Sequence, residues 1–294
     1  MSRASKYGIR ELHGDFPTNK ACLEFIFDSR HDRRCSCGGV YSLRKGRKKF
    51  RCGRCRFEIA PARGTIFEKS STPLLLWFHA LLLFSNAKSG LSAKQLERYL
   101  AVTYKCAWRI LNEVRRSLIQ GFKRLQGLVE TDSAYLGGRR KGWKHRSEAI
   151  LSKPVAMAAI ERGGGVKAGV VSGTSGISTW KFITDSIHPG SRLFTDKHGS
   201  FDRMKTLYRL RSVNHSQREY VRGNTHVNTV ESFWSHIKRS VAGTHKRVSK
   251  QHLQSYLDAF VFHYNNRYSD RERFLSLLQI VLHAGAKKET PSGS

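Results

Sequence analysis

Residues 226–267 read HVNTVESFWSHIKRSVAGTHKRVSKQHLQSYLDAFVFHYNNR, and their pattern predicts helices at 226–241 and 249–267. In the first helix, apolar residues recur at the spacing of one buried helix face. These residues are Val230, Phe233, Trp234 and Ile237. Glu231 stands beside this face. An isolated carboxylate there is either a salt-bridge partner for a nearby Lys or Arg, or a ligand for a metal ion.

Two aspartates in strand-like runs favour the metal interpretation. Asp132 lies in LVETDSAYLGG (128–138), where alternating residues predict a strand, and Asp196 follows a short apolar run in RLFTDKHGSF (192–201). Considered alone, each of the three carboxylates is more simply interpreted as a salt-bridge partner for a nearby Lys or Arg. Two aspartates at strand ends and one helical glutamate can nevertheless converge on a pair of Mg²⁺ (or Mn²⁺) ions, an arrangement suited to phosphodiester chemistry.

The chain alternates between helical and strand-like regions. A short helix is expected at 19–27 and a strongly helical region at 73–120, and β-like runs follow at 128–136, 155–160, 166–171 and 192–195. A multidomain α/β protein is therefore predicted, with a polar, disordered tail at 285–294. We place its parts at 1–65, 66–125, 126–270 and 271–294.

Four of the six cysteines form two closely spaced pairs, Cys35-x-Cys37 and Cys52-x-x-Cys55. Because the N-terminus shows no export signal, such a cluster indicates zinc rather than disulfides, with four incidental thiols as the alternative. The segment between the pairs has the length of a β-hairpin that turns near Gly46. His31 is a substitute ligand if either cysteine of the first pair cannot reach the metal. The other two cysteines, Cys22 and Cys106, stand at apolar helical positions and are expected in the core.

The charge of the 294-residue chain points to a polyanionic partner. Lys and Arg number 53 against 22 Asp and Glu, a formal charge of +31, which excludes an ordinary small-molecule metabolic enzyme. Basic residues are spread along the whole chain and are not gathered on one amphipathic helix, so nucleic acid is favoured over a membrane surface. The longest apolar stretch, 74–84, is too short to span a bilayer, so a cytoplasmic protein is expected.

Two segments are candidates for DNA contact. The cysteine hairpin is dense in basic residues, among them Lys45, Arg47 and Lys48, which are either phosphate contacts or a solvated loop. Helices at 93–100 and 104–118, with Ser92 and Thr103 as caps, fit a helix-turn-helix, although any helical hairpin with surface Lys and Arg looks similar. The basic residues of the second helix are Lys105, Arg109, Arg115 and Arg116.

The 226–267 string resembles the C-terminal motif of bacterial insertion-sequence transposases of the DDE superfamily. The branch is the ISXO2-like one, which has an N-terminal zinc ribbon and is related to the eukaryotic Merlin elements. ETDSAYLGGRRKG (130–142) is similar to the first-Asp motif of that family and LFTDKHGSF (193–201) to the second. RGTIFEKSSTPLLLWFHALLL (63–83) resembles the segment that joins the ribbon to the helices. The resemblance covers roughly residues 15–270.

The resemblance implies a ribonuclease-H-like mixed-sheet catalytic domain with Asp132, Asp196 and Glu231 as its metal-binding triad. Lys238, two helical turns after Glu231 on the same face, would hold a DNA phosphate, and Asn228 would be a backup or second-sphere group. His226 and His198 match further motif positions and either orient ligands or DNA or are structural. Arg139 and Arg140 belong to a basic loop that flanks the site.

Two positions depart from the family pattern. Ser133 follows the first Asp where the family usually has an acidic residue, and Arg34 stands where its first zinc Cys would align. The implied function is a DNA transposase that binds terminal repeats, cleaves the ends of its element and joins the 3′-OH to target DNA. It would act as a dimer or larger assembly in the bacterial nucleoid. A non-catalytic DNA-binding protein and a ribonuclease-H-like nuclease without strand transfer are the alternatives.

Overall fold

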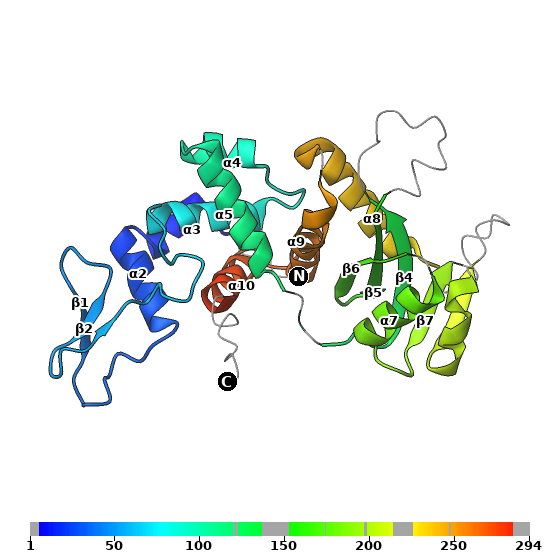
Figure 1. The fold of residues 1–294 in the computed structure, drawn as a ribbon, viewed down its shortest axis with the longest axis horizontal. Helices are drawn as coiled ribbons and strands as arrows, with labels where there is room; N and C mark the ends of the chain where they lie inside the picture. Colours follow the sequence, from blue (N-terminus) through cyan, green and yellow to red (C-terminus); the bar gives the residue numbers. More distant parts are fainter. Residues whose placement is uncertain are drawn as a thin grey trace, which may run out of the picture. The chain divides into compact units, whose positions relative to one another are not determined.

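A computed structural model of the chain describes residues 6–119, 121, 123–136, 153–173, 175–196, 199–213, 226–246 and 248–284 (Figure 1). The chain divides into two compact units. The first comprises Met1–Ala87, Ala93–Leu118 and Asn266–Ser294, and the second comprises Lys88–Ser92 and Ile119–Asn265. The expected disordered tail lies outside the described residues.

The first unit is helical with one small sheet. Its helices are α1 (Ile9–Asp15), α2 (Asn19–Asp28), α3 (Leu74–Asn86), α4 (Ala93–Leu100), α5 (Tyr104–Ser117) and α10 (Asp270–His283). The helices predicted at 19–27, 93–100 and 104–118 are confirmed within one residue at each end. Hydroxyl caps explain two of the starts, because Thr18 Oγ1 accepts from Ala21 N and Thr103 Oγ1 accepts from Cys106 N.

The small sheet is the predicted cysteine hairpin extended by one strand. Strands β1 (Tyr41–Leu43), β2 (Phe50–Cys52) and β3 (Glu58–Ile59) pair antiparallel in sequence order. The turn contains Gly46 at a φ of +73°, a left-handed conformation that favours glycine. Phe50 stacks on Phe27 of α2 with ring centroids 4.0 Å apart, which fixes the sheet to the helices.

The C-terminal helix α10 packs in the first unit, against α3. Its Arg273 side chain is only 1% exposed. The guanidinium donates to the Ser85 and Asn266 carbonyls, to Asn86 Oδ1 at 3.3 Å and to Asp270 Oδ1 at 2.6 Å. One buried cation therefore links α10 to the C-terminal end of α3 within the first unit.

Replacing Arg273 by Ala is expected to destabilise the first unit by about 3 kcal/mol, because the Ser85 and Asn266 carbonyls lose a buried donor and Asp270, which is 36% exposed, loses its ion-pair partner. The matched control is Arg271→Ala on the same helix. The Arg271 side chain is 56% exposed and lies 3.5 Å from Asp15, so that change should cost below about 1 kcal/mol. Amide hydrogen exchange in α3 and α10 measures both effects. Equal protection in the two variants would contradict the assigned role of Arg273.

The second unit is built on a five-stranded mixed sheet. Its strands are β4 (Leu128–Tyr135), β5 (Val155–Glu161), β6 (Val166–Val171), β7 (Arg192–Asp196) and β8 (Arg209–Val213), in the spatial order β6-β5-β4-β7-β8. The β4-β5-β6 portion is antiparallel, whereas β7 and β8 run parallel to β4. This order and these directions are those of a ribonuclease-H-like sheet, so the predicted α/β fold class is confirmed.

Helices cover both faces of this sheet. On one face, α7 (Gly176–Ser186) and the 3₁₀ segment η1 (Gly199–Thr206) contribute to a core with Val129, Met157 and Leu193. On the other, α8 (Asn228–Ser240) and α9 (Leu253–Asn265) pack on small residues such as Ala158. A π-helical segment η3 (Val241–His245) and a 3₁₀ segment η4 (Lys250–His252) lie between α8 and α9. The apolar face predicted for the 226–241 helix is buried in this second core.

Candidate functional site

Strands β4 and β7 bring Asp132 and Asp196 to the same end of the sheet. The two strands are parallel neighbours, and Thr131 is paired with Thr195. Asp132 and Asp196 are the next residue on each strand. Because side chains alternate along a strand, both aspartates project on the face opposite Val129 and Leu193, which is the face that α8 covers.

Helix α8 adds Glu231, which lies in its first turn and is solvent-exposed. The pKa of Asp132 is raised to about 6, first by burial and then by the negative charges of Glu231 and Asp196. The Ser133 N–H, 2.7 Å from Asp132 Oδ1, and the charge of Lys238 act in the opposite direction. The fold therefore brings these three acids and Lys238 into one electrostatic neighbourhood.

The donor set of this neighbourhood suits a hard divalent cation. Carboxylate oxygens are the ligands that Mg²⁺ prefers, and a cation would offset both the burial of Asp132 and the negative charges of Glu231 and Asp196 that raise its pKa. Asp132, Asp196 and Glu231 are the residues that would hold it. Within the described part of the chain, their oxygen atoms are not gathered as tightly as the four cysteine sulfurs described below.

The other residues predicted for this site differ in their exposure and in their contacts. Asn228 is exposed at the first position of α8, and Lys238 is exposed in its last turn. His226 is half-buried, with its carbonyl accepting from Arg162 Nη2 and its Nδ1 3.5 Å from Glu130 Oε1. Arg139, Arg140 and His198 lie outside the described residues.

Glu130 is a residue of this region that sequence reasoning missed. Its side chain is fully buried on the same face of β4 as Asp132. The carboxylate accepts from the backbone N–H groups of Thr229 and Val230, at 2.8 and 3.2 Å, and from Arg162 Nε. It thereby caps the N-terminus of α8 and holds that helix against β4. The last N–H group that it accepts from, on Val230, directly precedes Glu231. The only sequence signal was an acidic residue two positions before Asp132.

Glu130→Ala is expected to destabilise the second unit by about 3 kcal/mol, the low end for breaking a buried pair, because Arg162 is 22% exposed and can reach water. Glu161→Ala is the control. Glu161 lies in the same sheet but is only half-buried, so its loss should cost below about 1 kcal/mol. Urea unfolding followed by amide exchange in β4 and α8 measures both. Equal midpoints would show that Glu130 does not anchor α8.

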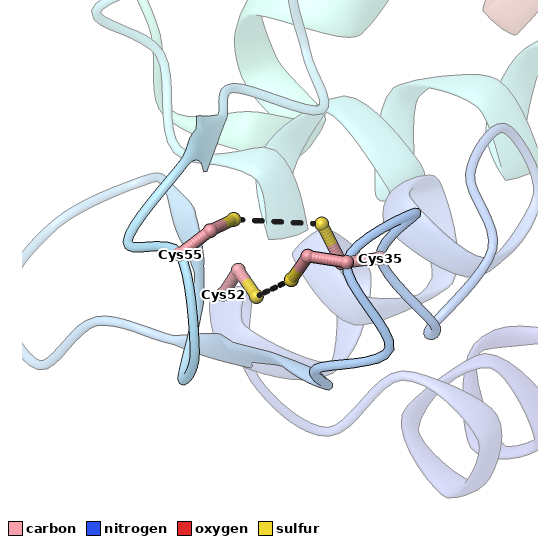
Figure 2. Close-up of side chains that lie close together, drawn as sticks. Cys35, Cys52 and Cys55 are labelled. Atoms are coloured by element: carbon pink, nitrogen blue, oxygen red, sulfur yellow. Dashed lines mark hydrogen bonds between the residues drawn. The ribbon is translucent and has the colours of Figure 1, made fainter.

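The four cysteine sulfurs form a compact cluster in the first unit (Figure 2). Cys35 and Cys55 Sγ are 3.6 Å apart, Cys37 and Cys52 Sγ are 3.5 Å apart, and all four sulfurs lie within 4.8 Å of one another. Four thiolates on a tetrahedral zinc ion would be about 3.8 Å apart, since Zn–S bonds are about 2.3 Å long. Both cysteines of the first pair reach the cluster despite Arg34, and His31 packs instead against the Phe27 ring.

The loops around the sulfurs are shaped to bring them together. Gly38 has a φ of +82°, and a Cβ at Gly39 would lie 2.6 Å from Cys52 Sγ, so only glycine fits beside that sulfur. The pKa of Cys35 is lowered to about 6, mainly by the Cys37 N–H and then by the Tyr41 hydroxyl, 3.3 Å away. Donors that favour a thiolate prepare a metal ligand.

The basic hairpin of this sheet presents its predicted contacts to solvent. Lys45, Arg47 and Lys48 are exposed, and they line a groove of about 610 Å³ that also includes Leu23 and Leu74. Their arrangement leaves the charged ends accessible to a polyanion.

The helix pair α4 and α5 presents fewer basic groups than predicted. Lys105 and Arg116 are exposed. Arg109 is half-buried and donates to Thr72 Oγ1 at 3.0 Å. Arg115 is only 6% exposed, so its expected place on the open basic face is wrong. It stands beside Val114 and one turn after Leu111, on the face of α5 that packs into the core.

The two cysteines outside the cluster differ in their burial. Cys22 is fully buried, as predicted, whereas Cys106 is half-buried with its Sγ 3.4 Å from Thr72 Oγ1. In the described part of the chain, no helix has the length and apolar character needed to cross a bilayer.

Comparison with known proteins relates the chain to proteins of transposable elements. Residues 124–265 match the family described as "ISXO2-like transposase domain". The chain is also 28% identical over 230 residues to a Halobacterium salinarum protein named "Uncharacterized protein in transposable element ISH50", over 72% of this chain and 77% of the relative. Because that relative is archaeal, it does not support the expected bacterial context.

Proposed function

Because residues 124–265 match the ISXO2-like transposase domain, we propose that the chain is a DNA transposase that cleaves the ends of an insertion sequence and joins them to target DNA. In this proposal Asp132, Asp196 and Glu231 bind divalent metal, and the four-cysteine cluster binds a structural zinc ion. Residues 1–125 would bind the terminal repeats and residues 126–270 would perform the chemistry. The protein would act in the nucleoid of its host.

The observation that supports this proposal best is the placement of the acids. Asp132 and Asp196 follow a paired position on adjacent parallel strands, and the field of Glu231 acts on Asp132. A protein that only binds DNA has no use for a buried Asp132 on which two further carboxylates act, because negative charge there repels a polyanion. The same arrangement suits phosphoryl transfer, in which positioning and charge neutralisation supply most of the catalysis.

Each residue has a separate task in the proposed reaction. The three carboxylates hold the ions, Glu130 keeps the first turn of α8 against β4, and Lys238 holds a DNA phosphate beside the acids. Asn228 is a reserve oxygen ligand at the start of the same helix. When bound, Mg²⁺ supplies activation of the attacking oxygen and stabilisation of the leaving oxygen. Two ends must be joined in concert, so a dimer or larger assembly on DNA is expected.

A strand-joining assay tests the proposal. The purified protein is incubated with Mg²⁺, duplexes that end in the pre-cleaved terminal repeat, and a supercoiled target plasmid. Joined products that depend on Mg²⁺ are the expected result. Nicking without joining would identify a nuclease instead, and binding without either reaction would identify a DNA-binding protein. Duplexes of scrambled sequence serve as the control for end recognition.

A further inference from the structure

Strands β7 and β8 carry a row of arginines on the same face of the sheet as Asp196. Arg192 and Arg209 are register partners, and Arg211 is paired with Phe194. Leu193 and Leu210 belong to the core formed with α7 and η1, so the arginines on either side of them project to the opposite face. Asp196 projects to that face as well, because it is four residues after Arg192.

All three arginines of this row are solvent-exposed. Like charges placed directly opposite each other on paired strands repel and cost stability. Arg192 and Arg209 occupy such opposed positions, and Arg211 extends the row along β8. Arranging three cations in this way is favourable when an anion normally lies over them.

A polar hollow lies at the beginning of the row. It has a volume of about 410 Å³ and is lined by Arg192, Arg209, His188, Ser191 and residues at the start of β4. It sits at the N-terminal ends of the parallel strands, opposite the end that holds Asp132 and Asp196. The hollow is large enough to hold a phosphate group, and both arginines are among its lining residues.

We propose that Arg192, Arg209 and Arg211 form a track for the backbone of duplex DNA, which passes from this hollow toward Asp196. The inference rests on the proposed function and adds a substrate contact to it. Arg192 and Asp196 are four positions apart on β7, about 13 Å. That length corresponds to about four nucleotides at 3.4 Å of helix axis each. The arginines occupy the first two positions of this distance, about 7 Å, and Asp196 lies two positions further on, so the whole path fits a linear polyanion better than a single free phosphate.

The test is the salt dependence of binding to a random-sequence DNA duplex. Removing two phosphate contacts in the Arg192→Gln/Arg209→Gln variant should reduce the slope of log affinity against log salt by about 1.8, at about 0.9 per phosphate. Arg192→Lys/Arg209→Lys keeps both charges and should retain the slope. Arg203→Gln is the matched control, because Arg203 is also exposed but lies on η1, on the opposite face of the sheet.

The outcomes separate this inference from the proposed function. If the wild-type protein joins strands but the double Gln variant has the slope of the Arg203→Gln control, the track is wrong and the transposase assignment stands. If the wild type neither binds duplex DNA nor joins it, the proposed function is wrong, and the track that depends on it is wrong as well. Thermal shift with inorganic phosphate is the third measurement. A hollow that binds phosphate while the DNA slope is unchanged in the double variant is an anion site only, which overturns the track.

Discussion

Replacing Asp196 by Asn is expected to reduce strand joining by more than about 10³-fold, because loss of one preorganised electrostatic group in an active site already costs about 10²–10³-fold. The substitution keeps the shape of the side chain and removes the negative charge that would hold a divalent cation. Binding to DNA should persist, since the exposed basic residues of the hairpin and of β8 remain in place.

The control for this experiment is Asp185→Asn. Asp185 belongs to α7, which packs on the opposite face of the sheet, and its side chain is 61% exposed in a surface pair with Lys181. Joining should be unchanged in that variant. Measuring joined product and DNA affinity in parallel distinguishes lost chemistry from lost binding. If Asp196→Asn still joins strands at the wild-type rate, the catalytic assignment is wrong.

Removing the zinc ligands is expected to have the largest effect on stability. Cys52→Ser/Cys55→Ser should abolish zinc binding and unfold the small sheet, because structural zinc supplies about 10–16 kcal/mol of apparent binding free energy, which is also folding free energy. The sheet has only three short strands, and a sheet this small needs more than its own strand pairing to be stable. Its stacking of Phe50 on Phe27 should be lost with the metal.

Metal analysis and spectroscopy together test this expectation. The purified wild-type protein should contain about one zinc ion per chain, and the double variant none. Cys106→Ser is the matched control, since that half-buried thiol is outside the sulfur cluster and should leave the zinc content unchanged. A wild-type protein free of zinc, or a double variant that retains it with the same melting curve, would contradict the site.

Local patterns predicted much of this fold. The helices at 93–100 and 104–118 follow from apolar spacing and a Thr cap, which depend on neighbours a few residues away. The four cysteines were recognised by their spacing, because a metal site of this type is built from two short loops. Strand β8 was missed, since its arginines give it the composition of a surface loop rather than of a strand.

The catalytic candidates were predicted from pattern and resemblance, but residues around them were not. Asp132, Asp196 and Glu231 lie far apart in the chain, and their roles stay a prediction until the joining assay is done. Glu130 was not predicted because its function depends on two backbone N–H groups about a hundred residues later. The burial of Arg115 was not predicted because the buried face of a helix depends on which elements pack against it, and composition alone does not identify those elements.

The sequence by itself indicated a polyanionic partner, the four cysteines that cluster and most of the helices and strands, because charge, short-range spacing and periodicity are properties of the chain. Only the tertiary structure decided which distant groups meet. It placed Asp132 and Asp196 on adjacent parallel strands, buried Glu130 beneath α8, and returned Arg273 to the helices of the first unit. Such contacts depend on long-range pairing and on which side chains are removed from water, and no local window of sequence contains either.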